Sequence, residues 1–292
     1  MNRNFAPAPD RLTFAAALVG LGVLSLVYGD FALQWQPVPA WVPGRTALAY
    51  LSGVVLLCMA AGLAWQRTAA AASRVLFAYV LLWFVLLEVP KIAREPLVEG
   101  NWSGAGEIAA ILAGGWILFQ TLGQGRGSTR GFFAGERGKR VATLLLALGV
   151  IPIGIAHFVY APQTIGFVPK WIPFRPFWAY LGGAGHIAAG LGILLGVVPR
   201  LAATMEAGMI AVFTALVWVP LVVASPKSQL PWTGLFVSWI VGAAAWVVAA
   251  SMRSSASKVH PDLAGLPRPT AMDGSPAQAS ASVMPERGQP TH

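Results

Sequence analysis

Long apolar runs separated by short polar connections dominate the chain. Eight such runs lie at 12–33, 47–65, 74–90, 104–121, 141–160, 177–197, 201–223 and 234–251. A helix needs about 20 mostly apolar residues to cross the hydrocarbon core of a bilayer. The pattern therefore predicts an all-α integral membrane protein with eight transmembrane helices. Residues 252–292 are rich in Ser, Ala, Pro and Gly without periodicity, so we expect a disordered tail there.

The composition excludes the ordinary soluble classes of protein. Charged residues make up 11% and hydrophobic residues 56% of the chain, whereas about 25% of the residues of a soluble domain are charged. The 12 Trp and 14 Phe residues contradict the signature of a disordered chain. Cys58 is the single cysteine, which excludes an intrachain disulfide, a CxxC redox pair and a cysteine-rich metal site.

Lysine and arginine are distributed unequally between the two sides of the predicted bundle. Fourteen fall on the side of the termini, and six fall on the other side, namely Arg45, Lys91, Arg94, Lys170, Arg175 and Lys227. The positive-inside rule then places both termini in the cytoplasm, as in a multi-pass protein of the inner (plasma) membrane. Lipid headgroups account for the net charge of +9, so we expect the lipid bilayer and not nucleic acid as the partner.

The second half of the chain repeats the first. The letters WVPGR at 41–45 match WIPFR at 171–175, and the same offset of 130 residues pairs Trp102 with Trp232. We therefore expect two parallel four-helix repeats related by an axis along the membrane normal. The predicted domains are a first repeat at 1–125, a basic cytoplasmic linker at 126–140, a second repeat at 141–251 and a disordered cytoplasmic tail at 252–292. The Trp- and Pro-rich connections at 34–45 and 163–175 are expected either to cap the bundle at the outer interface or to form an aromatic belt only.

The second half resembles the DoxX family of small four-helix membrane proteins. The resemblance rests on GVIPIGIAHF at 149–158 and on YLGGAGHIAAGLGILLGVVPRLAA at 180–203. His157 stands at the family's Lys or His position, and His186 stands where the family usually has Glu. In the first half Asp30 and Leu56 occupy these positions, so that half has diverged further. The resemblance implies a quinone as cofactor and a role beside a redox partner in sulfur oxidation or oxidative-stress complexes.

Ionisable side chains within the apolar runs are the candidate functional residues, because a charge in a membrane span is costly. Asp30, Glu88, Glu107 and His157 lie near the outer helix ends. His186 lies roughly 13 Å along its helix at 1.5 Å per residue, which is near the midplane. This asymmetry favours a small polar cavity that opens to the periplasmic side. No third ligand completes a metal site, and we expect no haem.

Each acidic candidate also has a structural explanation. Glu88 can pair with Lys91 across one turn. Glu107 is expected in the first turn of its helix, where a carboxylate favours the helix dipole. Solvent alone accounts for Asp30, and Glu206 is expected near the cytoplasmic end of the seventh helix.

The two histidines lie on consecutive antiparallel helices. We expect both imidazoles to point into the second bundle, and to lie within about 10 Å of each other if they share a ligand. A proton relay from His157 and His186 toward Glu107 or Asp30 and a plain interhelical hydrogen bond are both open alternatives.

Three functions are compatible with the sequence. The first is an accessory subunit of a quinone-linked or sulfur or oxidative-stress redox system. The second is a small-solute or proton-coupled carrier, favoured by parallel repeats and by helices expected to break at Pro90 and Pro220. The third is a membrane assembly protein without chemistry. The chain carries no P-loop, dinucleotide fingerprint, HExxH or GxSxG motif, so whether it is an enzyme is left open.

Overall fold

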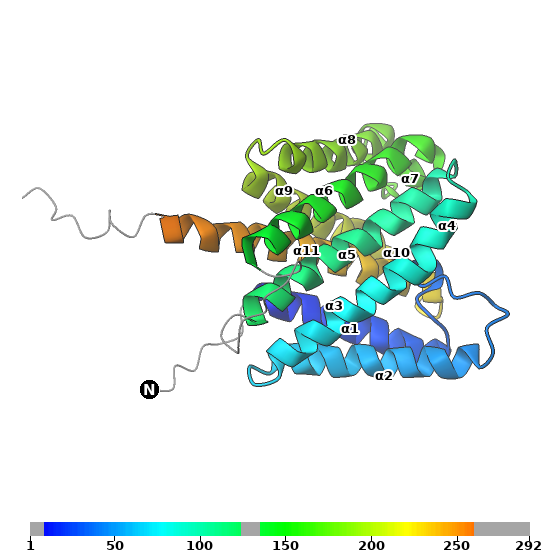
Figure 1. Cartoon of the computed structure of the whole chain (residues 1–292). Helices are drawn as coiled ribbons and strands as arrows, with labels where there is room; N and C mark the ends of the chain where they lie inside the picture. The colour runs from blue at the N-terminus through cyan, green and yellow to red at the C-terminus, as the bar shows by residue number, and fades with distance from the viewer. Residues whose placement is uncertain (1–8, 124–134, 260–292) are drawn as a thin grey trace, which may run out of the picture. The chain divides into compact units, whose positions relative to one another are not determined.

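The computed structural model describes residues 9–123 and 135–259, and the described chain is helical with no strand. Figure 1 shows its elements, which are α1 (Pro9–Tyr28), η1 (Leu33–Trp35), α2 (Arg45–Ala64), α3 (Ala69–Trp83), η2 (Phe84–Glu88), α4 (Val89–Arg94), α5 (Glu99–Gly123), α6 (Gly135–Val159), α7 (Ala161–Phe167), α8 (Arg175–Leu194), α9 (Pro199–Phe213), η3 (Thr214–Trp218), α10 (Val219–Ala224) and α11 (Gln229–Val259).

Eight helical stretches within the described ranges are long and apolar enough to cross a membrane. They are Pro9–Tyr28, Arg45–Ala64, Ala69–Arg94, Glu99–Gly123, Gly135–Val159, Arg175–Leu194, Pro199–Ala224 and Gln229–Met252. The prediction of an all-α fold with eight such helices is therefore confirmed, and the helices fit a multi-pass membrane protein.

Several helix boundaries differ from those expected. Helix α5 begins at Glu99 rather than at 104, and α6 begins at Gly135, inside the expected linker. Helix α11 continues to Val259, eight residues past the expected boundary at 251. Polar residues at these ends lack the apolar signal but prolong the hydrogen-bond ladder of a helix that is already formed. The remainder of the expected linker and tail, at 126–134 and 260–292, lies outside the described residues.

The third and seventh spans are continuous through their prolines. A π-helical turn, η2 or η3, precedes Pro90 and Pro220, and the helix then runs on to Arg94 and Ala224. The expectation of helices broken at these prolines is thus wrong. Proline lacks an N–H and crowds the carbonyl four residues earlier, and the wider π-helical turn accommodates both defects.

Close helix contacts at glycines hold the bundle together. A Cβ atom at Gly149 of α6 would lie 2.6 Å from the backbone oxygen of Gly106 in α5, and one at Gly154 would lie 2.6 Å from that of Gly183 in α8. Any larger side chain at these points would force the backbones apart. Helix α6 consequently packs on both α5 and α8, as Figure 1 shows. These contacts place the outer end of α6 between the two helices that supply the site residues described next.

Candidate functional site

A cavity of about 660 Å³ lies among α5, α6, α8, α9, η3 and α11. The connection before α8 closes part of its wall with Phe167, Val168 and Trp171. Most of the lining is aliphatic or aromatic, and the polar exceptions are Glu107, His157, Thr164, His186 and Ser238. Such an apolar space with a few convergent polar groups is the usual form of a small-molecule site.

Two of the polar lining groups are already engaged within the protein. The Thr164 hydroxyl donates to the backbone oxygen of His157 at 3.2 Å. The Ser238 hydroxyl lies 3.0 Å from that of Thr214. The two histidines and Glu107 are therefore the groups in the wall that are best placed to meet a ligand.

His157 occupies the last turn of α6, where its ring is half-buried. Its Nδ1 lies 2.9 Å from the backbone oxygen of Ile153. A carbonyl oxygen only accepts, so Nδ1 must carry the proton and donate. In neutral His157 the other ring nitrogen, Nε2, is then a hydrogen-bond acceptor.

His186 forms a buried pair with Glu206. Its Nδ1 lies 2.7 Å from Oε1 of Glu206, and the two side chains are 3% and 0% exposed. The second carboxylate oxygen, Oε2, is buried without a hydrogen-bond partner in the described structure. An isolated charge at this burial would be very costly, so the two partners hold one proton between them or separate it as an ion pair.

The position of Glu206 corrects the sequence interpretation. Glu206 was expected near the cytoplasmic end of its helix, yet it meets His186, which lies deep in α8. Seven residues separate Glu206 from Pro199 at the start of α9, a rise of about 10 Å at 1.5 Å per residue. Only the rotation of α9 against α8 creates the pair, and the signal in the sequence was an unexplained acid two turns into an apolar helix.

The structure brings the two histidines together as expected. Their ring centroids lie 5.3 Å apart, and both rings line the same cavity. Phe213 of α9 lies against both, with centroid distances of 6.4 Å to His157 and 6.2 Å to His186. The prediction that both imidazoles face into the second half, close enough to share a ligand, is confirmed.

Glu107 is the acidic candidate that shares this cavity. It lies eight residues after Glu99, so it is in the third turn of α5 and the expectation of a first-turn carboxylate is wrong. The cause is the earlier start of α5, at polar residues that the apolar pattern left out. Its Oε2 is buried and has no partner in the described structure, and the side chain lies within electrostatic reach of Glu88, Lys91 and Glu99.

Glu88 and Asp30 are outside the cavity wall and form ion pairs. The Lys91 ammonium lies 3.3 Å from Glu88, whose side chain is 1% exposed, so the expected pair across one turn is confirmed. Asp30 accepts from Arg45 at 2.6 Å and remains one-third exposed. No group of three or more His, Cys, Asp or Glu side chains suited to a metal ion occurs in residues 9–123 and 135–259.

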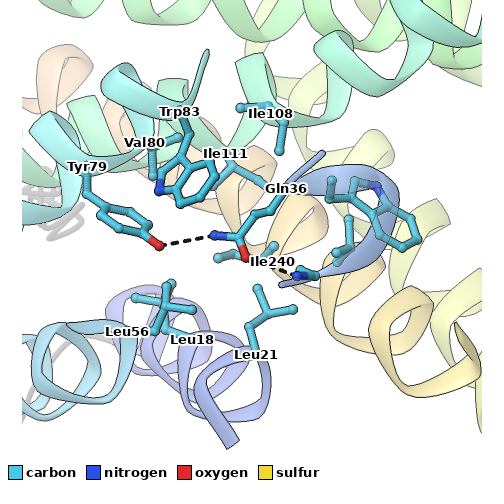
Figure 2. A pocket seen from close by; sticks show the side chains of 13 residues that line it. Leu18, Leu21, Gln36, Leu56, Tyr79, Val80, Trp83, Ile108, Ile111 and Ile240 are labelled. Atoms are coloured by element: carbon cyan, nitrogen blue, oxygen red, sulfur yellow. Dashed lines mark hydrogen bonds between the residues drawn. The ribbon is translucent and has the colours of Figure 1, made fainter. Parts of the chain in front are cut away.

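A much smaller cavity, of about 50 Å³, lies in the first half (Figure 2). Gln36 donates to the Tyr79 hydroxyl at 3.1 Å across it, and that hydroxyl also lies 2.6 Å from the Ser52 hydroxyl. Leu56, which is 130 residues before His186, is one of its apolar lining residues. The first half therefore has no counterpart of the histidine pair.

Comparisons with protein-family models, curated proteins and solved structures give no match for this chain. The resemblance to the DoxX family remains a prediction from the quoted motifs.

Proposed function

We propose that the protein is a DoxX-like membrane protein that binds a lipophilic hydroquinone-class molecule and serves as an accessory subunit of a redox system. The observation that carries this proposal is the pair of histidines in the wall of the 660 Å³ apolar cavity. An apolar ring and tail suit the aromatic lining, and a hydroxyl group suits the acceptor Nε2 of His157.

The chemistry proposed for these side chains is hydrogen bonding and proton acceptance. A hydroquinone hydroxyl donates to Nε2 of His157, and on oxidation its proton moves to that nitrogen. The adjacent His186–Glu206 pair supplies a carboxylate that offsets the positive charge formed on His157. The two electrons leave to an oxidising partner protein in the membrane or periplasm.

The proposal includes two copies of one four-helix unit. Equivalent elements begin 130 residues apart, as α2 at Arg45 and α8 at Arg175 do. Equivalent hydrogen bonds also recur, because Trp102 donates to the oxygen of Pro96 and Trp232 to that of Pro226. With an even number of spans in each copy and the excess of basic residues on one side, the cavity opens toward the periplasmic face of the plasma membrane.

The test is ligand binding by the full chain in lipid nanodiscs, measured by calorimetry with 2-decylhydroquinone. His157→Phe keeps an aromatic ring and removes Nε2, so we expect about tenfold weaker binding, the value of one good hydrogen bond. Asp30→Asn, outside the cavity wall, is the matched control and should bind as the unaltered protein does. Absence of binding to the unaltered chain, or equal affinity of His157→Phe, would contradict the proposal.

A second candidate function, carriage of a lipophilic cation, is supported by Glu107. Its unpartnered Oε2 accompanies Trp35, Trp178 and Trp218 in the cavity wall, and aromatic faces with a carboxylate bind organic cations. In the same nanodiscs, binding of tetraphenylphosphonium that Glu107→Gln abolishes, without binding of 2-decylhydroquinone, would replace the first proposal with this one.

A further inference from the structure

Trp35 is a first-half residue in the wall of the second-half cavity. It belongs to η1, its side chain is 5% exposed, and it lines both the large and the small cavity. Its indole Nε1 is buried and has no hydrogen-bond partner in the described structure. A buried donor without an acceptor destabilises a protein, so its retention beside a binding cavity needs an explanation.

Other indoles of the outer region have backbone acceptors. Trp102, Trp178 and Trp232 donate to the backbone oxygens of Pro96, Pro173 and Pro226 at 2.8, 3.0 and 2.9 Å. The connections of this fold thus readily satisfy an indole N–H. Trp35 differs because it lies at the boundary of the cavity instead of beside a connection.

The backbone around Trp35 is strained and firmly held. Leu33 has a φ of 44°, a left-handed conformation that a leucine rarely adopts. Gln229 of α11 donates to the backbone oxygen of Phe31 at 3.0 Å, and Gln36 accepts from the backbone N–H of Ala32 at 3.1 Å. Contacts from outside η1 therefore fix a costly conformation that places the indole in the cavity wall.

We infer that the indole N–H of Trp35 donates to an acceptor oxygen of the bound molecule and thereby determines specificity. This inference rests on the proposed function and narrows its ligand class. His157 selects a hydroxyl group as donor, and Trp35 selects a second oxygen on the same ring system as acceptor. The ligand class is accordingly a lipophilic ring with two separate oxygen functions, one read by each half of the chain.

The experiment compares two probes on three forms of the full chain in nanodiscs. The probes are 2-decylhydroquinone and 3-decylphenol, which lacks one of the two oxygens. The variants are Trp35→Phe, which keeps a ring and removes the donor, and Trp232→Phe, whose indole is outside the cavity lining. Affinities come from calorimetry, and melting temperatures report on folding.

The expected result is selective. Trp35→Phe should bind 2-decylhydroquinone about tenfold more weakly and 3-decylphenol with unchanged affinity. Its melting temperature without ligand should be equal or higher, because an unsatisfied donor is gone, whereas Trp232→Phe should keep both affinities. Equal losses for both probes would overturn the assignment of Trp35 and leave the proposed function intact. Failure of the unaltered chain to bind either probe would overturn both.

Discussion

The two halves place different chemistry at equivalent points of similar helices. Leu56 and Leu76 lie 130 residues before His186 and Glu206, and all four side chains are almost completely buried. Two leucines thus stand in the first half where a hydrogen-bonded acid and base stand in the second. The helix arrangement tolerates either pair, so the His186–Glu206 pair is not required for this packing and is better explained by the cavity beside it.

The same comparison explains the sizes of the two cavities. In the first half, Tyr79 and Gln36 extend across the space and hydrogen-bond, which leaves about 50 Å³. In the second half, Gly182 stands at the position of Ser52 and Met209 at that of Tyr79, and the cavity measures about 660 Å³. Filling one site and opening the other leaves a single binding site in a chain with two similar halves.

The largest effect is expected from breaking the buried acid–base pair. His186→Leu leaves Glu206 buried without its partner and should lower the free energy of unfolding by about 3–5 kcal/mol. The double variant His186→Leu/Glu206→Leu reproduces the first-half pair and should regain most of that loss. Both should abolish binding of 2-decylhydroquinone. Chemical unfolding in detergent micelles measures the stabilities, and a double variant no more stable than the single one would refute the equivalence of the halves.

A smaller loss is expected at the Glu88–Lys91 pair, which the second half replaces with Trp218 and Leu221. Lys91→Met leaves a 1% exposed carboxylate without its cation and should cost about 2–3 kcal/mol. Lys139→Met is the control, because its partner Glu136 is 74% exposed, and it should cost less than about 1 kcal/mol. Equal unfolding free energies for the two variants would show that Glu88 gains no stability from Lys91.

The smallest effect concerns the polar contacts that fill the first cavity. Tyr79→Phe removes the hydroxyl that Gln36 and Ser52 share and should destabilise the chain by about 1–2 kcal/mol. Ligand affinity of the second half should not change. Weaker binding of 2-decylhydroquinone by this variant would show that the two cavities are coupled, for example through Trp35.

Some of this arrangement follows from the sequence for clear physical reasons. Apolar runs of about 20 residues fix the number of membrane-length helices, because no other element satisfies the backbone in lipid. His157 and His186 stand out because ionisable groups in such runs are rare. Their common cavity follows from adjacent helices that run in opposite directions.

Other features depend on geometry that the apolar pattern does not contain. The partner of His186 depends on the rotation of α9, and the depth of Glu107 depends on where α5 begins among polar residues. Trp35 lies in a connection without periodicity, where a strained Leu33 sets the direction of the chain. Its place in the cavity wall could therefore be found only from the folded arrangement.

The π-helical turns of the third and seventh spans have a consequence for which side chains face inward. A π-helical turn contains about one residue more than an α-helical turn, and each residue of a helix advances the side-chain direction by about 100°. The segment after such a turn is thus rotated relative to the segment before it. Helix α3 and the stretch that follows it can therefore belong to one membrane span and yet present different sequence faces to the interior. Removing a single residue from η2 would restore a regular spiral and turn Glu88 away from its buried position toward lipid.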